Sequence, residues 1–250
     1  MFYFDNFYGN KILKSTLLSD FDCFFTTRQF VLTPANREDL IQQAEKNRLF
    51  LKNKLNCNEI YTSKQVHSDN IAVVEEDKTF YDNTDALISS IKGSLLIMNF
   101  ADCVPIILYS KNDNTGAIVH AGWRGTAANI AEKTVKKMND LGIKSENITA
   151  LIGPAIGKCC FCVDEEVFNK LVPDISNVSF YEKKDNKYYI DLKLINNSQL
   201  LRSGITNIDI CDYCICCMSD IFFSYRKENG ITARHSAVIK IKEDNRNVSN

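Results

Sequence analysis

The sequence predicts a single-domain α/β or α+β protein in which mixed β-sheets are layered with helices. Segments with a helical hydrophobic period are interspersed with short, β-rich apolar runs along the chain. No linker rich in Gly, Ser or Pro and no internal repeat divides it. With 250 residues, 45% of them hydrophobic, the chain can bury one substantial core. We therefore expect one domain over residues 1–242 and a flexible tail at 243–250.

Four segments have the features of helices, and they lie at residues 37–55, 126–139, 165–171 and 192–202. The second places Ile130, Val135 and Met138 on one face, which we expect to point inward. The fourth follows Asp191, a favourable N-cap residue, and is followed by Gly204, a favourable C-terminal stop.

The expected strands are apolar, β-rich runs at residues 59–66, 86–89, 95–100, 104–109, 117–120, 149–152, 221–225 and 236–241. The runs at 104–109 and 117–120 are apolar on both faces, which is typical of strands in the interior of a protein. We expect these two strands to form the centre of the fold.

Charge composition narrows the class of partner. Thirty basic and 31 acidic residues give a formal net charge of -1. Such a balance argues against a broad surface for nucleic acid or anionic membrane. A small molecule is therefore the expected partner, and the oligomeric state is left open.

Targeting signals are not apparent in the sequence. The apolar start, Met1 to Asp5, lacks a basic region and a cleavage site, so it does not resemble a signal peptide. The most apolar stretch, residues 95–109, is interrupted by Asn99 and Asp102 and is too short to cross a bilayer as a helix. We expect a cytoplasmic protein whose ten cysteines are reduced thiols or metal ligands.

Two of the three histidines and one cysteine lie in short motifs at the ends of expected strands. They are His67, Cys103 and His120. Imidazole and thiolate are good zinc ligands, and a catalytic zinc site usually has three protein ligands and one open position. By residue type alone, ordinary histidines and a buried thiol are an equally good interpretation, because the spacing is too long for a local zinc finger.

The flanking residues favour the metal site. Gly122 and Gly125 bracket Arg124 just before an expected helix, where backbone N–H groups favour an anion and Arg124 could clamp a phosphate or carboxylate. Asp102, next to Cys103, is either a carboxylate that orients a ligand, a general acid or base, or a turn residue between two strands.

Five segments of the chain form a characteristic set. They are Gln65-Val66-His67, Ala101-Asp102-Cys103-Val104-Pro105, His120-Ala121-Gly122-Trp123-Arg124-Gly125, Ile152-Gly153-Pro154-Ala155-Ile156-Gly157 and Phe223-Ser224-Tyr225-Arg226. Together they resemble the YfiH-like, laccase-domain family, and the resemblance extends from about Phe25 to Ile239. The His-Ala-Gly-Trp-Arg-Gly segment is highly specific for the family.

The resemblance implies one catalytic domain with zinc bound by His67, Cys103 and His120. It implies a purine nucleoside enzyme that phosphorolyses adenosine, inosine or methylthioadenosine and deaminates adenosine. Phosphorolysis needs a phosphate beside C1′, whereas deamination uses zinc-activated water at C6. The candidate catalytic residues are Asp102 and Cys103, and the candidate substrate or phosphate contacts are Arg48, Gln65, Arg124 and Arg226.

Three other functions compete with this one. The family has also been described as copper-dependent phenol oxidases, and a His₂Cys set suits copper, but a multicopper relay needs more than three histidines. Members have also been called peptidoglycan-editing factors, for which the Cys103 thiolate or zinc-activated water would attack a precursor. A non-catalytic scaffold would bind no metal and turn over no substrate.

The chain departs from the family pattern at three places, which are Gln29-Phe30-Val31, Ile215 and Ala233. These changes affect the rim of the expected pocket more than the metal site. Two cysteine-rich segments, 159–162 and 211–217, include a Cys-x-x-Cys pair at Cys211 and Cys214. One such pair does not make a zinc ribbon, so ordinary thiols are the preferred interpretation. The third histidine, His235, is expected to be a surface or core residue.

Overall fold

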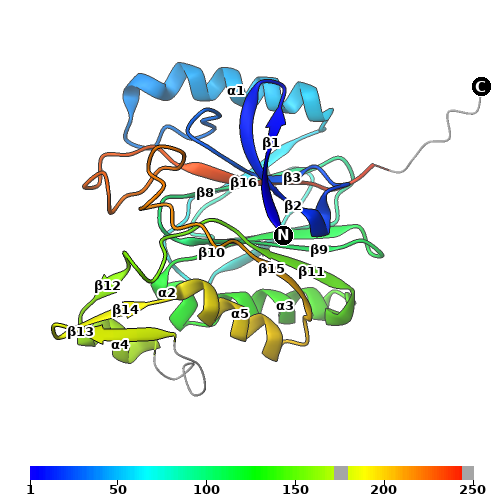
Figure 1. Cartoon of the computed structure of the whole chain (residues 1–250). Coiled ribbons are helices and arrows are strands. Elements are labelled where there is room, and N and C mark those ends of the chain that lie inside the picture. The colour runs from blue at the N-terminus through cyan, green and yellow to red at the C-terminus, as the bar shows by residue number, and fades with distance from the viewer. Residues whose placement is uncertain (172–179, 244–250) are drawn as a thin grey trace, which may run out of the picture.

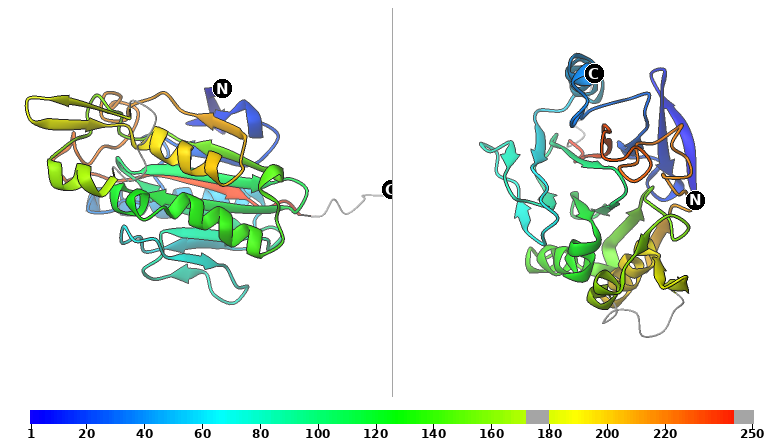
Figure 2. Two further views of the ribbon diagram at one scale, coloured as in Figure 1. Left: turned by 90° about the horizontal axis from the view of Figure 1, so that it is seen from below. Right: turned by 90° about the vertical axis from the view of Figure 1, so that its left-hand side faces the viewer.

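The computed structural model describes residues 1–171 and 180–243, and they form four layers (Figure 1). Two β-sheets lie face to face in the middle, helix α1 (Ile41–Leu55) covers one, and helices α3 (Ile130–Asp140) and α5 (Leu192–Arg202) cover the other. The end-on view of Figure 2 shows α1 and the α3/α5 pair on opposite sides of the sheets. The predicted fold class, a single mixed α/β domain, is confirmed.

The first sheet has seven strands in the order β1-β2-β3-β16-β8-β4-β6. Its pairs are antiparallel from β1 to β8, and β4 then runs parallel to β8 and to β6. The strands are β1 (Phe2–Phe7), β2 (Asn10–Ser15), β3 (Cys23–Thr26), β16 (His235–Lys240), β8 (Leu95–Phe100), β4 (Ile60–Ser63) and β6 (Phe80–Tyr81).

The second sheet has six strands in the order β15-β11-β9-β10-β7-β5. Its two central strands pair antiparallel, so that His120 lies opposite Pro105. The strands are β15 (Asn207–Ile210), β11 (Ile148–Ile152), β9 (Val104–Ser110), β10 (Thr115–Ala121), β7 (Ala86–Ser89) and β5 (Ile71–Val73). A small third sheet contains β12 (Cys162–Val163), β14 (Lys187–Ile190) and β13 (Tyr181–Lys184).

The core has its centre at β9 and β10, in which every residue is buried. Ile107 and Ile118 pack between the sheets, while Ile106 and Val119 pack against the layer of α3 and α5. Alternate side chains of one strand thus enter different apolar layers, as expected for strands covered on both sides. The prediction that these two strands lie in the interior is confirmed.

The predicted helices are found, with two differences. A 3₁₀ turn, Glu38–Leu40, precedes α1, so the regular helix begins four residues later than expected. The segment expected to be one helix at 126–139 is two, α2 (Trp123–Ala127) and α3, because Asn129 adopts a left-handed conformation with φ 59° between them. Helices α4 (Glu165–Leu171) and α5 have the predicted bounds, and two further 3₁₀ turns lie at Thr16–Leu18 and Ser145–Asn147.

One predicted strand, at residues 221–225, is wrong. The segment folds into turns in which Phe222 N–H donates to the carbonyl of Met218. Phe222 and Phe223 are both buried but pack in different apolar clusters, so their hydrophobicity reflects burial rather than strand pairing. The sequence prediction also omitted the N-terminal hairpin β1–β2, whose turn at Tyr8 and Gly9 has positive φ at both residues.

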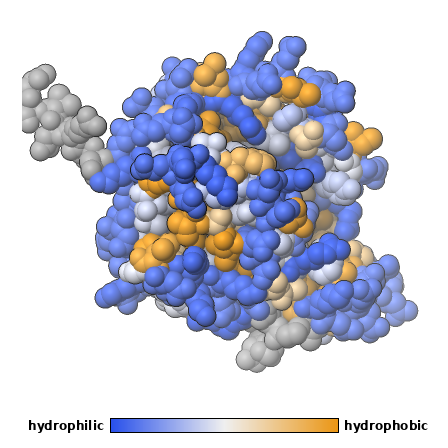
Figure 3. Space-filling view, turned by 180° about the vertical axis from the view of Figure 1, so that it is seen from behind, coloured by the Kyte–Doolittle hydropathy of each residue, from blue (hydrophilic) through white to orange (hydrophobic). Residues whose placement is uncertain are grey.

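The rear face in Figure 3 is mainly hydrophilic, with small separate apolar patches. Over the described residues, none of the helices has the length and apolar character needed to span a membrane. The tail expected at 243–250 lies, apart from Glu243, outside the described residues.

Candidate functional site

The structure brings His67, Cys103 and His120 together. His67 follows β4, Cys103 lies between β8 and β9, and His120 belongs to β10. The ligand atoms of these three side chains all lie within 4.8 Å of one another, and the two imidazole rings meet edge to face at 4.9 Å between centroids. A single metal ion about 2.0 to 2.3 Å from each donor therefore needs only small side-chain shifts.

Gly122 makes this close approach possible. A Cβ atom at position 122 would lie 2.9 Å from Cδ2 of His67 and 3.0 Å from Sγ of Cys103. Such contacts are too short for carbon, so an alanine would push the His67 and Cys103 side chains aside. From the sequence, Gly122 was expected in an anion-binding turn, whereas its contacts show that it allows His67 and Cys103 to pack closely.

Asp85 is the carboxylate that orients the group, a role considered for Asp102 from the sequence. Its Oδ1 lies 2.8 Å from Nδ1 of His120, which leaves Nε2 of that ring for a metal. The same carboxylate accepts hydrogen bonds from the backbone N–H groups of Val66, His67 and Ser68 and from the Ser68 hydroxyl. One buried side chain therefore fixes both the His120 ring and the His67 loop.

The charged forms of Cys103, His120 and Asp85 stabilise one another. Burial tends to raise the pKa of Cys103, but the neighbouring His120 and His67 outweigh it and lower the pKa to about 6. Burial tends to lower the pKa of His120, but Cys103 and Asp85 raise it to about 9. The pKa of Asp85 falls to about 2 because the hydrogen bonds from His120 and Ser68 outweigh its burial. Cys103 is therefore a thiolate near neutral pH, the form that binds metals.

Two residues of the site have positive φ, which is uncommon for residues other than glycine. His67 has φ 62° and Asp102 has φ 89°. Such conformations cost on the order of 1 to 3 kcal/mol and persist where the surroundings enforce them. The conformation of Asp102 is held by two hydrogen bonds to its carboxylate, which the Ser224 hydroxyl and the Arg226 backbone N–H each donate at 2.7 Å.

A cavity of about 800 Å³ opens beside the ligand group. This volume suits a small molecule. The lining combines His67, Cys103 and His120 with other polar, charged and apolar side chains. The lining residues are Thr33, Ala35, Lys64, Gln65, His67, Asn99, Ala101, Asp102, Cys103, His120, Ile156, Phe161, Tyr225, Arg226 and Arg234.

Two of the four predicted substrate contacts, Gln65 and Arg226, line the cavity. Both are also held by backbone groups. The Gln65 amide donates to the Asn99 carbonyl at 2.7 Å and accepts from its N–H at 3.0 Å, which ties the His67 loop to the end of β8. The Arg226 guanidinium donates to the carbonyl of Cys160 at 3.0 Å.

The other two predicted contacts, Arg48 and Arg124, are not part of the lining. Arg48 donates to the Leu32 carbonyl and the Thr33 hydroxyl, so it lies behind the cavity wall and positions Thr33. Arg124 is exposed and stacks over the ring of Trp123, with 4.2 Å from Cζ to the centroid. The five-residue helix α2 thus does not bring a phosphate clamp to the cavity.

Asp85 and Arg234 were not predicted from the sequence as site residues. Asp85 precedes β7 without a metal-like spacing, and its role depends on the pairing of β7 with β10. Arg234 lines the cavity and donates to the carbonyls of Thr232 and Ala233. Its neighbour His235 is buried in the core, which is one of the two outcomes expected from the sequence. The Phe100 ring contacts the rings of both His120 and His235.

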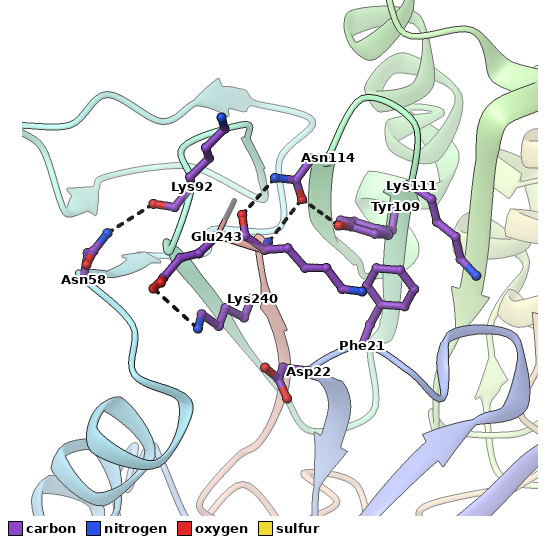
Figure 4. Close-up of a pocket in the computed structure, with 10 residues that line it drawn as sticks. Phe21, Asp22, Asn58, Lys92, Tyr109, Lys111, Asn114, Lys240 and Glu243 are labelled. Atoms are coloured by element: carbon purple, nitrogen blue, oxygen red, sulfur yellow. Dashed lines mark hydrogen bonds and ion pairs between the residues drawn. The ribbon is translucent and has the colours of Figure 1, made fainter. Parts of the chain in front are cut away.

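A larger hollow, about 1210 Å³, lies at the opposite end of β8 and β16 (Figure 4). Lysines and polar groups line it together with aromatic rings, and the lining residues are Phe21, Asp22, Asn58, Lys92, Tyr109, Lys111, Asn114, Lys240, Lys242 and Glu243. It has no histidine or cysteine among these residues. The smaller cavity is therefore the candidate functional site.

The fold and the site define a class: a four-layer α/β protein that holds a His₂Cys group at a cavity where strands from both sheets end. The chain belongs to the YfiH-like, laccase-domain family, whose model is described as multi-copper polyphenol oxidoreductase laccase and matches residues 32–242.

Known proteins resemble it over most of their length. The purine nucleoside phosphorylase YlmD of Geobacillus stearothermophilus is 36% identical over 187 residues, which cover 72% of this chain and 68% of that protein. An adenosine deaminase from an unknown prokaryotic organism is 31% identical, covering 69% and 71%. The crystal structure of the Bacillus licheniformis hypothetical protein YfiH matches with a TM-score of 0.85 and 27% identity, covering 96% of this chain and 99% of that one.

Proposed function

We propose that this protein is a zinc-dependent purine nucleoside phosphorylase for adenosine, inosine and methylthioadenosine, and that it also deaminates adenosine. The observation that carries the proposal is the group of His67, Cys103 and His120 at a cavity that Arg226 and Arg234 also line. The names of the relatives, purine nucleoside phosphorylase and adenosine deaminase, support the substrate class.

The donor set fits zinc. Two imidazoles and one thiolate are ligands that zinc prefers, and three protein ligands leave a fourth position open for catalysis. His67, Cys103 and His120 would hold the ion, and the Asp85 carboxylate would keep the proton of His120 on Nδ1. When bound there, zinc supplies Lewis acidity and lowers the pKa of water.

Arg226 and Arg234 are the proposed phosphate contacts. Both line the cavity, and guanidinium groups form strong hydrogen bonds with phosphate oxygens. Arg48 and Arg124 are not assigned this role because neither lines the cavity. Ile156 and Phe161 offer the apolar surface against which a purine ring can pack.

Asp102 is the proposed proton donor. Its carboxyl lines the cavity and is held in place by Ser224 and the Arg226 backbone. Burial raises the pKa of Asp102, although the hydrogen bonds from Ser224 and Arg226 oppose the shift. A carboxyl group with a raised pKa keeps its proton in a larger fraction of molecules, and we assign it to donate that proton to N7 of the departing purine.

Metal analysis and a nucleoside assay test the proposal together. The purified protein, incubated with inosine and phosphate, should release hypoxanthine and ribose 1-phosphate, and no base should form without phosphate. Adenosine without phosphate should yield inosine. Full turnover and full zinc content in Cys103→Ala would overturn the metal assignment.

A matched pair of variants tests the phosphate site. Arg234→Met should raise KM for phosphate at least about tenfold, because a charged hydrogen bond contributes about 1.5 to 3 kcal/mol. KM for the nucleoside should change little. Lys242→Met, in the opposite hollow, is the control and should leave both KM values unchanged.

Two competing activities are outcomes of the same experiment. Copper oxidation of phenols would appear as a strong visible thiolate-to-copper absorption together with phenol turnover. The chain contains three histidines, and His235 is buried outside the ligand group, which leaves too few for a multicopper relay. Hydrolysis of peptidoglycan precursors in preference to nucleosides would instead favour cell-wall editing.

A further inference from the structure

Four cysteine thiols meet in a second cluster, formed by Cys159, Cys160, Cys214 and Cys217. Their Sγ atoms all lie within 4.8 Å of one another. Sγ of Cys217 is 3.7 Å from that of Cys159 and 3.5 Å from that of Cys160. The first two cysteines follow β11 and the last two follow β15, so the cluster joins two loops that are distant in the sequence.

We propose that these four thiolates bind one Zn²⁺ as a closed, structural site. Tetrahedral zinc with Zn–S bonds of about 2.3 Å places its sulfurs about 3.8 Å apart, which is close to the two separations above. A cubane iron–sulfur cluster holds its cysteines farther apart, so the spacing points to a single ion. The site is separate from the His67, Cys103 and His120 group and does not depend on the proposed enzymatic activity.

The local backbone is arranged around the sulfurs. Cys214 and Cys217 have Cys-x-x-Cys spacing, and the Gly157 N–H donates to Sγ of Cys214 at 3.1 Å. A Cβ at position 157 would lie 3.0 Å from Cβ of Cys214 and 3.4 Å from Sγ of Cys159, so glycine leaves the room that the thiols occupy. The pair noted in the sequence, Cys211 and Cys214, is not the one that forms, because Cys211 is fully buried and outside the cluster.

Ionising four thiols this close together costs free energy unless a cation is bound, because neighbouring thiolates repel one another. A disulfide would use two sulfurs and leave the others crowded, whereas one divalent cation engages all four and releases their protons.

The ion would stabilise one wall of the cavity. The two loops already share a hydrogen bond from Ile215 N–H to the Ala155 carbonyl, and the Ile156 N–H donates to the carbonyl of Asp102. Arg226, a cavity residue, donates to the carbonyl of Cys160. Zinc at the cysteines would thus hold Ile156 and Arg226 in place without contacting substrate.

Metal content in a background that lacks the first site provides the test. Cys103→Ala/His120→Ala should retain about one zinc per chain. Adding Cys159→Ser/Cys217→Ser should reduce it to about zero. Adding Cys162→Ser/Cys216→Ser, which changes neighbouring cysteines outside the cluster, should leave one zinc. Equal zinc in the last two variants would overturn the proposal.

A measurement on the unaltered protein covers the case in which the variants do not fold. Thiols of the reduced, metal-free chain are alkylated with and without added zinc and mapped by mass spectrometry. Zinc should protect Cys159 and Cys217, both exposed, at least about tenfold, while Cys216 changes little. Cobalt in place of zinc should give the absorption of a tetrahedral tetrathiolate site. The site would be contradicted if zinc left these thiols unprotected. It would also be contradicted if the protein formed a Cys160–Cys217 disulfide and took up no zinc once that disulfide was reduced.

Discussion

The two ends of the central strands are both hollowed, but they differ in chemistry. At one end, β8, β10 and β16 meet the cavity of His67, Cys103 and His120. At the other end, the same β8 and β16 lead to the lysine-lined hollow of Figure 4, which is larger. The Lys242 ammonium there lies over the Phe21 ring, 3.8 Å from its centroid.

The difference shows that volume does not identify the functional end. At the cavity end, a carboxylate, a thiolate and two imidazoles contact one another in partly buried surroundings, where their charges interact strongly. At the lysine end, cationic side chains reach solvent along aromatic rings, as is typical of a solvated surface.

The largest loss of metal affinity is expected from Gly122→Ala. Its matched control is Gly116→Ala, near the other end of β10. The Cβ at 122 would displace His67 and Cys103, whereas the Cβ at 116 would meet the Cδ1 atoms of Ile239 and Ile241. Overpacking of this kind costs about 1 to 3 kcal/mol. In Gly122→Ala the cost should appear as up to about 100-fold weaker metal binding and matching loss of turnover.

In Gly116→Ala the cost should appear only in the free energy of unfolding, with metal affinity unchanged. Metal titrations and urea denaturation of both variants measure the two quantities. Tight metal binding in Gly122→Ala would show that the ligand group is not closed by that glycine.

An effect on metal affinity no larger than that of Gly122→Ala is expected from Asp85→Asn. The variant removes the negative charge that orients His120 and replaces one acceptor oxygen for the N–H groups of the His67 loop by an NH₂ group. Changes of this kind usually reduce metal affinity about 10- to 100-fold. Competition with a chelator measures the affinity. The control is Asp69→Asn, which lies in the His67 loop and breaks only an exposed ion pair with Lys133 of α3. Equal metal affinities in the two variants would contradict the role of Asp85.

The last prediction concerns the pH dependence of stability and His235, the first residue of β16 at the cavity end. Burial lowers the pKa of His235 from 6.5 to about 3, so between these values the unfolded chain binds the proton and the folded chain does not. Stability from the neutral ring is fully present above the unfolded pKa and is lost as pH falls towards 3. Between pH 7 and pH 5 the loss should be about 2 kcal/mol.

His235→Gln should lack this part of the pH dependence. Urea unfolding of both proteins at the two pH values isolates it, because the other titrating groups are shared. Identical pH dependence in the variant and the unaltered protein would show that His235 is protonated in the folded chain.

The sequence by itself determined the class of fold, the buried pair β9 and β10, and the three residues of the candidate metal site. Hydrophobic periodicity follows burial, and strands buried on both faces leave a continuous apolar run that one chain segment displays alone. The motifs around His67, Cys103 and His120 carried the ligand set, and their proximity was confirmed.

Only the tertiary structure decided what surrounds those ligands. Asp85 meets His120 because β7 pairs with β10, and Arg234 reaches the cavity because β16 lies beside β8. Arg48 and Arg124 fall outside the lining for the same reason, since the direction of a side chain depends on the packing of its element. The four cysteines of the second cluster come from two loops that only the parallel pairing of β11 and β15 brings together. Contacts between distant segments arise from strand order, which no local pattern in the sequence encodes.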